Sequence, residues 1–111
     1  MTTYEVVFTD DARQDLFDIY TYIAIEDSIA KADKLIESLK NACKRLSELP
    51  TRGHVPHEFD HLNISDYLEI HCKEYRIIYE VVGKTVYIYC VVHMKRDVEE
   101  LLKQRLLRST N

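Results

Sequence analysis

The sequence predicts an α+β fold in the order β-α-α-β-β-β-α: an antiparallel sheet, a helical hairpin on one of its faces, and a C-terminal helix. Three observations predict this fold. Apolar residues recur at helical spacing through residues 10–49 and stop at Pro50. Three short runs of β-branched and aromatic residues follow between residues 67 and 93, and a leucine-rich segment begins at Asp97. The 111 residues are enough for one domain with one core.

The N-terminal half contains one strand and two helices. The run "YEVVFT" at residues 4–9 is typical of a strand. Helical spacing then continues to about Glu26, with Asp10 placed to cap the helix. Ser28 can cap a second helix that ends at Pro50, because proline cannot continue a helix. Since the break between them is short, the two helices should form an antiparallel hairpin.

Residues 51–65 predict a long loop, because they contain Gly53 and Pro56 and show no regular period. Long loops inside compact domains are often functional. The loop holds His54, His57 and His61, but it offers no cysteine pair and no fixed scaffold, so we expect no metal site there. The sequence also lacks a P-loop and a GxGxxG motif, and we expect no cofactor.

Three strands are expected at residues 67–73, 75–82 and 85–93, and Gly83-Lys84 fits a type II′ hairpin turn. Such a turn would pair Ile77 with Cys90 and Arg76 with Val91. One face is then apolar and should carry the helical hairpin. The other face should be turned outward and is mixed, with Arg76, Glu80, Tyr87, Tyr89 and His93. Tyrosines beside an arginine are favoured at interfaces. A plain solvent face with cross-strand tyrosine packing is an equally open interpretation.

The C-terminal segment predicts a third helix. Asp97 and Glu100 have the spacing of a capping box. Five residues follow at helical spacing and give the helix an apolar stripe that also includes one arginine: Val98, Leu101, Leu102, Arg105 and Leu106. This helix either docks on the sheet or binds a partner.

The charge pattern and the cysteines limit the class of protein. The net charge of -4 argues against a general nucleic-acid binder, so we expect no sequence-specific DNA binding by the protein alone. Residues 10–27 hold six acids and one base, and residues 94–108 hold five bases and three acids, which could orient a partner or form two ordinary solvated faces. No membrane span or signal peptide is recognisable, which predicts a cytoplasmic protein. The cysteines are expected to be buried and reduced: Cys43, Cys72 and Cys90.

Four segments together resemble the RelE/ParE superfamily of type II toxins, whose members are often described as plasmid stabilisation proteins. They are "YEVVFTDDARQDLFDIYTYI", "LSELPTRG", "EYRIIYEVVGKTVYIYCVVHMKRD" and "LLKQRLL", and they span almost the whole chain. The resemblance implies the toxin of a toxin–antitoxin module, held inactive by a cognate antitoxin. It also implies one of two activities: RelE-like members cut mRNA on the ribosome, and ParE-like members poison DNA gyrase.

The resemblance to the RelE-like nucleases is incomplete. Arg76 and Arg96 match two arginines of those nucleases, but their lysine pair and their C-terminal tyrosine have no counterpart here. RNA cleavage needs groups that transfer protons as well as cations. In this chain His71 and His93 would have to supply them. The nuclease alternative therefore rests on Arg76, Arg96, His71 and His93.

The continuous Lys95-Arg96-Asp97 ending, which runs directly into a leucine-rich helix, resembles ParE more closely. This resemblance implies a gyrase inhibitor without catalytic residues, or a homologue that only binds its antitoxin. Residues expected to bind the target or antitoxin are Arg76, Tyr87, Tyr89, His93, Lys95, Arg96, Leu101, Leu102 and Arg105. For Lys95 and Arg96 an ordinary role at the start of the last helix is an equally open interpretation.

Overall fold

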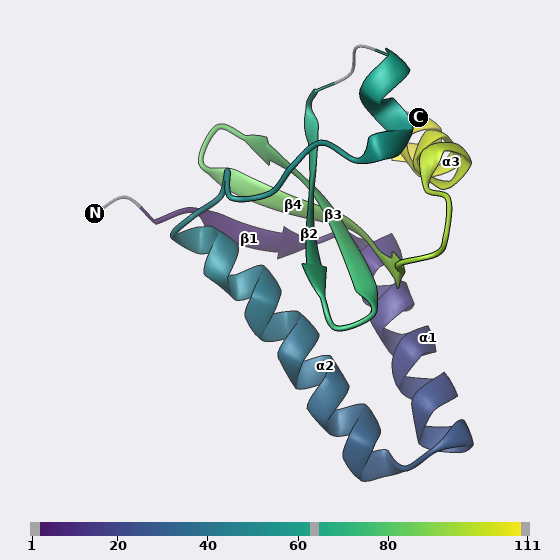
Figure 1. Ribbon diagram of the computed structural model, residues 1–111. Coiled ribbons are helices and arrows are strands. Elements are labelled where there is room, and N and C mark those ends of the chain that lie inside the picture. The colour runs from purple at the N-terminus through teal and green to yellow at the C-terminus, as the bar shows by residue number, and fades with distance from the viewer. Residues whose placement is uncertain (1–2, 63–64, 110–111) are drawn as a thin grey trace.

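The predicted order of elements is confirmed in the computed structural model, which describes residues 3–62 and 65–109 (Figure 1). The strands are β1 (Glu5–Phe8), β2 (Tyr67–Cys72), β3 (Tyr75–Val82) and β4 (Thr85–His93). The helices are α1 (Asp10–Glu26), α2 (Ile29–Lys44) and α3 (Glu99–Ser109), with 3-10 turns η1 (Arg45–Ser47) and η2 (His57–Leu62). The side chains of His61 and Leu106 lie outside the described residues.

The four strands form one sheet in the order β1-β4-β3-β2. Strands β2, β3 and β4 are antiparallel, as predicted. Strand β1 joins β4 in parallel, with Phe8 opposite Ile88, a pairing that the sequence did not reveal. Gly83 has φ +61°, as the first position of a type II′ turn requires.

A β-bulge at Tyr89 changes the register in the second half of β4. Tyr79 lies opposite Ile88 as predicted, but Ile78 lies opposite Cys90, so Tyr89 is an extra residue in β4. A one-residue insertion exchanges the faces of all side chains that follow it.

The predicted pairs beyond this bulge are therefore wrong. Ile77 lies opposite Val91 rather than Cys90, and Arg76 lies opposite Val92 rather than Val91. His93 lies opposite Tyr75, which packs against the core under the helical hairpin. His93 thus belongs to the hairpin side of the sheet, not to the side that carries Arg76.

Helix α1 is tied to the sheet where it begins. Its N-cap is Thr9 rather than the predicted Asp10: the Thr9 hydroxyl accepts a hydrogen bond from the Ala12 amide at 3.1 Å. The same hydroxyl donates to the carbonyl oxygen of Ile88 at 2.9 Å. One threonine therefore caps the helix and anchors it to β4.

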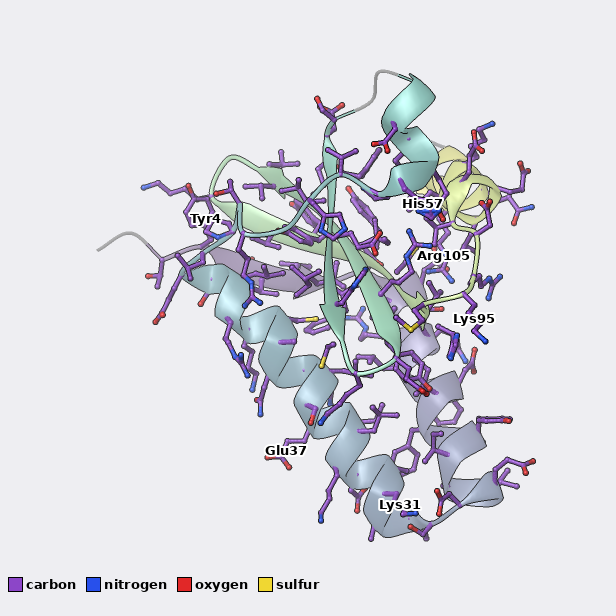
Figure 2. All side chains as sticks on the ribbon, in the orientation of Figure 1. Tyr4, Lys31, Glu37, His57, Lys95 and Arg105 are labelled. Carbon is purple, nitrogen blue, oxygen red and sulfur yellow. The ribbon has the colours of Figure 1, made fainter. Side chains whose placement is uncertain are left out.

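The two long helices form the predicted hairpin, which extends well beyond the sheet (Figure 1). Ser28 caps α2, as predicted, by accepting a hydrogen bond from the Lys31 amide at 3.1 Å. In Figure 2 the hairpin tip carries Lys31, and Glu37 points away from the sheet. Helix α2 ends at Lys44 and η1 continues to Ser47, so the regular helix is shorter than Pro50 alone suggested.

Both faces of the sheet are covered. The hairpin side buries a core that includes Leu16, Leu39, Leu46, Ile77, Tyr79 and Ile88. The opposite side buries a second core of Phe59, Ile78, Cys90, Val92, Val98 and Leu102. The expectation that this second face is turned outward is wrong, because η2 and α3 dock on it. The bulge provides the apolar surface for this docking by moving Cys90 and Val92 onto that face.

The cysteines are free thiols within the fold. Cys43 and Cys90 are buried, and burial raises the pKa of each to about 12. Cys72 is half-buried, and its thiol donates to the Ser38 carbonyl at 3.6 Å. Buried thiols with raised pKa values, such as those of Cys43 and Cys90, are poor nucleophiles. None of the described helices is both long enough and apolar enough to cross a bilayer.

Gly53 lets the segment before η2 lie directly against β2. Its amide donates to the Tyr79 hydroxyl at 3.1 Å, and a Cβ at this position would lie 2.7 Å from that oxygen and 2.7 Å from the carbonyl oxygen of Glu69. We expect Gly53→Ala to lower the free energy of unfolding by about 1–3 kcal/mol, because the segment must move off the strand. Urea denaturation measures this loss. The exposed Thr51→Ala should change stability by less than about 0.5 kcal/mol, and equal stability of the two variants would contradict the close approach.

Candidate functional site

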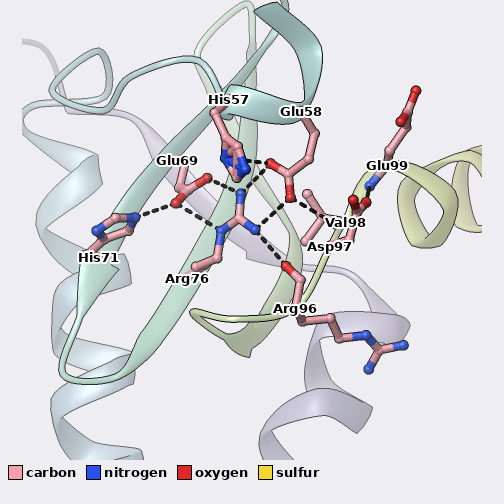
Figure 3. Close-up of polar contacts among 9 residues, drawn as sticks. All are labelled: His57, Glu58, Glu69, His71, Arg76, Arg96, Asp97, Val98 and Glu99. Carbon is pink, nitrogen blue, oxygen red and sulfur yellow. Dashed lines mark hydrogen bonds and ion pairs between the residues drawn. The ribbon is translucent and has the colours of Figure 1, made fainter.

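Arg76 lies at the centre of a buried polar cluster between β2, β3, η2 and the turn after β4 (Figure 3). Its side chain is 3% exposed. The guanidinium donates to both Glu58 carboxylate oxygens at 2.7 and 2.6 Å, and to both Glu69 oxygens at 3.0 and 2.7 Å. A fifth bond, of 2.6 Å, goes to the carbonyl oxygen of Arg96. A guanidinium has five N–H donors, so every donor of Arg76 is used inside the protein.

The charges of this cluster stabilise one another. Burial alone would raise the pKa of Glu58, but hydrogen bonds from Arg76 and from the Val98 amide, at 3.0 Å, lower it to about 2. For Glu69, burial is likewise outweighed by the hydrogen bonds from Arg76 and His71, and the pKa is lowered. The Glu58 hydrogen bonds raise the pKa of Arg76. Two carboxylates thus face one guanidinium, which leaves one net negative charge.

His71 borders this cluster on the solvent side. It lies directly opposite Arg76 in the β2–β3 ladder, and its Nε2 contacts Glu69 Oε2. The side chain is 48% exposed. The ring of His54 packs edge-on against it, with ring centroids 5.4 Å apart. His71, His54 and Glu69 therefore form a compact group at the edge of the cluster.

His93 lies on the other face of the sheet. Its ring packs against Tyr75 with centroids 5.9 Å apart, and its Nδ1 accepts a hydrogen bond from the Lys95 amide at 3.2 Å. It borders a surface pocket with Asp15 and Tyr22 of α1. The structure therefore does not bring His93 together with His71.

The cations Lys95 and Arg96 lie in the exposed turn that follows β4. The backbone of Arg96 joins the buried cluster through its carbonyl, while its side chain points away from Arg76 (Figure 3). Figure 2 likewise shows Lys95 projecting outward. Both side chains are accessible to a binding partner without rearrangement.

Tyr87 and Tyr89 form a stacked pair on the α3 side of the sheet, with centroids 6.5 Å apart. Tyr89 donates a hydrogen bond to Glu80 at 2.8 Å and packs edge-on against Tyr67. Both tyrosines are half-buried. They therefore contribute to packing within the chain while part of each remains accessible.

Arg105, predicted as a contact residue, holds α3 against the rest of the fold. Its guanidinium donates to both oxygens of Asp15 in α1 at 2.7 and 2.8 Å, and to the Tyr89 carbonyl at 2.8 Å. Asp15 in turn accepts a hydrogen bond from the Val91 amide at 2.9 Å. Asp15 and Arg105 thus satisfy the Val91 N–H and the Tyr89 C=O of β4. Both groups lie beyond Ile88, the last residue of β4 that pairs with β1. On the same helix Leu102 is buried and Leu101 is half-buried.

Sequence reasoning missed the role of Glu58. The residue is absent from the candidate site residues that the sequence predicts. No local pattern indicates that a loop carboxylate will face an arginine 18 positions later. The one available signal was Arg76 itself. An arginine among the apolar residues of a strand is expected to be buried, and a buried charge requires a partner of opposite charge.

Comparisons with known proteins agree on the fold. The family model described as "ParE toxin of type II toxin-antitoxin system, parDE" matches residues 6–98. A structure of the chromosomal ParDE system from P. aeruginosa has a TM-score of 0.71 at 16% identity, and the match covers 86% of this chain and 100% of that chain. No curated protein matches by sequence.

Two further solved structures are similar in fold. The RelBE2 toxin–antitoxin complex from Mycobacterium tuberculosis has a TM-score of 0.57 at 23% identity, covering 82% of this chain and 98% of that one. A mutant of the E. coli toxin RelE in the free state has a TM-score of 0.63 at 16% identity, covering 96% and 97%. Because the family match spans most of the sequence, we conclude that this chain belongs to the ParE toxin family of type II toxin–antitoxin systems.

Proposed function

We propose that this protein inhibits DNA gyrase, that it thereby blocks replication, and that a cognate antitoxin neutralises it by binding. One observation carries the choice against mRNA cleavage: all five donors of Arg76 are occupied by Glu58, Glu69 and the Arg96 carbonyl. An arginine that stabilises a phosphorane must have donors directed at the substrate. Arg76 has none to offer while the cluster is intact.

The positions of the histidines support the same choice. General acid–base cleavage requires both proton-transfer groups within reach of one phosphate. His71 contacts Glu69 on the α3 side of the sheet, and His93 packs against Tyr75 on the hairpin side. The gyrase target is the one that the resemblance of the Lys95-Arg96-Asp97 ending to ParE implies. The antitoxin partner is proposed because the matched family and a matched structure are toxin–antitoxin systems.

The proposed contact surface consists of the exposed His93 at the end of β4 and of Lys95 and Arg96 in the turn that follows. The accessible parts of Tyr87, Tyr89 and Leu101, on the α3 side of the sheet, are proposed as additional contacts. Arg76, Leu102 and Arg105 make their contacts within the fold and are not part of this surface. Exposed cations at the edge of a polar surface steer and orient an acidic partner.

We expect Lys95→Ala with Arg96→Ala to weaken growth inhibition by about tenfold, because two charged contacts are removed from an interface. The melting temperature should not change, since both side chains are exposed. Growth curves over a range of inducer concentrations, with circular dichroism of the purified variant, measure both effects. Lys84→Ala is the matched control, an exposed lysine in the β3–β4 turn. If the double variant were as toxic as the wild type, Lys95 and Arg96 would not belong to the proposed contact surface.

The mechanism is tested by induction without antitoxin, followed by uptake of labelled thymidine and methionine. Early loss of thymidine uptake with methionine uptake intact supports the proposal, and purified protein should then inhibit supercoiling by gyrase. Early loss of methionine uptake would overturn it in favour of mRNA cleavage. If growth is unchanged although folded protein is present, the protein is not toxic, and antitoxin binding remains as its only proposed function.

A further inference from the structure

We propose that His54, His71 and Glu69 form a binding site for a first-row transition-metal dication such as Zn²⁺. Each residue offers one ligand atom, and these atoms all lie within 4.8 Å of one another. Two imidazoles and one carboxylate form a donor set that suits Zn²⁺, Co²⁺ or Ni²⁺, whereas Mg²⁺ and Ca²⁺ prefer oxygen ligands. Three protein ligands leave at least one position for water.

The backbone holds the three residues in place. Glu69 and His71 are two positions apart on β2, so their side chains share one face of the strand. His54 lies beside Glu69 in an antiparallel bridge, with backbone hydrogen bonds of 3.0 and 2.7 Å between them. Gly53 permits this approach, because a Cβ there would collide with β2. The ligands therefore come from two segments that are already fixed to each other.

Hydrogen bonds from Arg76 hold the Glu69 carboxylate in a fixed orientation. Arg76 donates to both Glu69 oxygens and fixes the plane of the carboxylate. Metal ligands are commonly held in this way by outer-shell hydrogen bonds. Arg76 adds a positive charge near the site, but Glu58 pairs with it, so the three groups together carry one negative charge. The electrostatic environment therefore favours a dication.

Access and geometry are also suitable. The three residues line a pocket of about 300 Å³ that opens to solvent and is also lined by His57, Asp60 and Met94. The Nε2 of His71 already contacts Glu69 Oε2. In a tetrahedral zinc site the donor atoms are about 3.3 Å apart, as Zn–N bonds of about 2.0–2.1 Å require. Rotation of the exposed His54 and His71 rings brings their nitrogens into this range, and the metal then takes the place of the present His71–Glu69 contact.

The proposed ligands differ from the residues of the proposed gyrase contacts, although Met94, next to Lys95, also lines the pocket. His54 and Glu69 belong to the edge of the sheet formed by β2, whereas Lys95 and Arg96 follow β4. A bound ion would link the loop segment to β2 directly. Because it would bind only the folded chain, it should raise the thermal stability of the protein.

The test uses the full-length protein without a histidine tag, dialysed against a chelator and then titrated with Zn²⁺ in a calorimeter. We expect one equivalent to bind with a dissociation constant of about 10 μM or lower, and the melting temperature to rise. His54→Ala and His71→Ala should each weaken binding at least about tenfold. His93→Ala should bind as the wild type does, because it removes a histidine from the other face. Co²⁺ provides a second readout through its visible absorption.

Two results would overturn the proposal. One is the absence of stoichiometric Zn²⁺ binding to the folded wild-type protein, which would leave His71 and Glu69 as a hydrogen-bonded pair only. The other is retention of wild-type affinity in both His54→Ala and His71→Ala. Circular dichroism establishes that each variant is folded, so weakened binding in a folded variant is attributed to the removed ligand.

Discussion

Arg76→Ala should lower the free energy of unfolding by about 3–5 kcal/mol, a large part of the stability of a small domain. The substitution leaves Glu58 and Glu69, both with side chains no more than 4% exposed, without their cation. It also removes the donor to the Arg96 carbonyl, which positions the turn before α3. Urea denaturation followed by circular dichroism measures the loss.

Two variants distinguish this structural role from a role in catalysis or contact. Arg96→Ala keeps the carbonyl that Arg76 binds and removes only an exposed side chain, so its stability should equal that of the wild type. Replacing Arg76 by Met together with Glu58→Gln and Glu69→Gln removes the unpaired charges and should recover part of the loss. If Arg76→Ala proved as stable as Arg96→Ala, the cluster would not hold the fold together.

Acid should destabilise the protein through Glu58. Its pKa is about 2 in the folded chain and about 4.3 in an unfolded one, so below about pH 4.3 the unfolded state binds the proton first. Stability that is fully present above this range is lost progressively as the pH falls towards 2. The difference corresponds to about 3 kcal/mol, because each unit of pKa is worth about 1.4 kcal/mol.

Denaturation at a series of pH values from 6 down to about 2 tests this expectation. Glu58→Gln is the matched control, because it keeps a hydrogen-bonding side chain that does not titrate. Its stability should be lower at neutral pH and should depend less on pH. Parallel curves for the variant and the wild type would show that the acid sensitivity arises elsewhere.

Local sequence patterns were sufficient to predict the elements. Helical spacing, Ser28, Gly83 and the alternating strands led to the correct order and to two strands with the correct bounds. These signals act over a few residues, because capping, turn geometry and side-chain period are local properties. Such signals do not extend to the parallel pairing of β1 with β4, whose partners lie 80 positions apart.

The candidate site was harder to predict because it depends on one inserted residue and on contacts between distant segments. The register set by the Gly83 turn was extended beyond Tyr89, although the bulge there exchanges the two faces. His93 was therefore placed beside Arg76 when it lies on the opposite face. Arg76 was expected to be exposed because its partner Glu58 comes from a loop without a recognisable pattern.

The place of β1 in the sheet has a consequence for synthesis on the ribosome. Among the described strands its neighbour in the sheet is β4, which begins at Thr85. Until that strand has left the exit tunnel, β1 has no partner, and the hairpin that follows it has only part of its sheet to cover. Loop closure over so many residues is slow and must await the last quarter of the chain. We therefore expect a chain that stops before this point to have an incomplete sheet with an open edge and to be degraded by proteases more readily than the full-length protein.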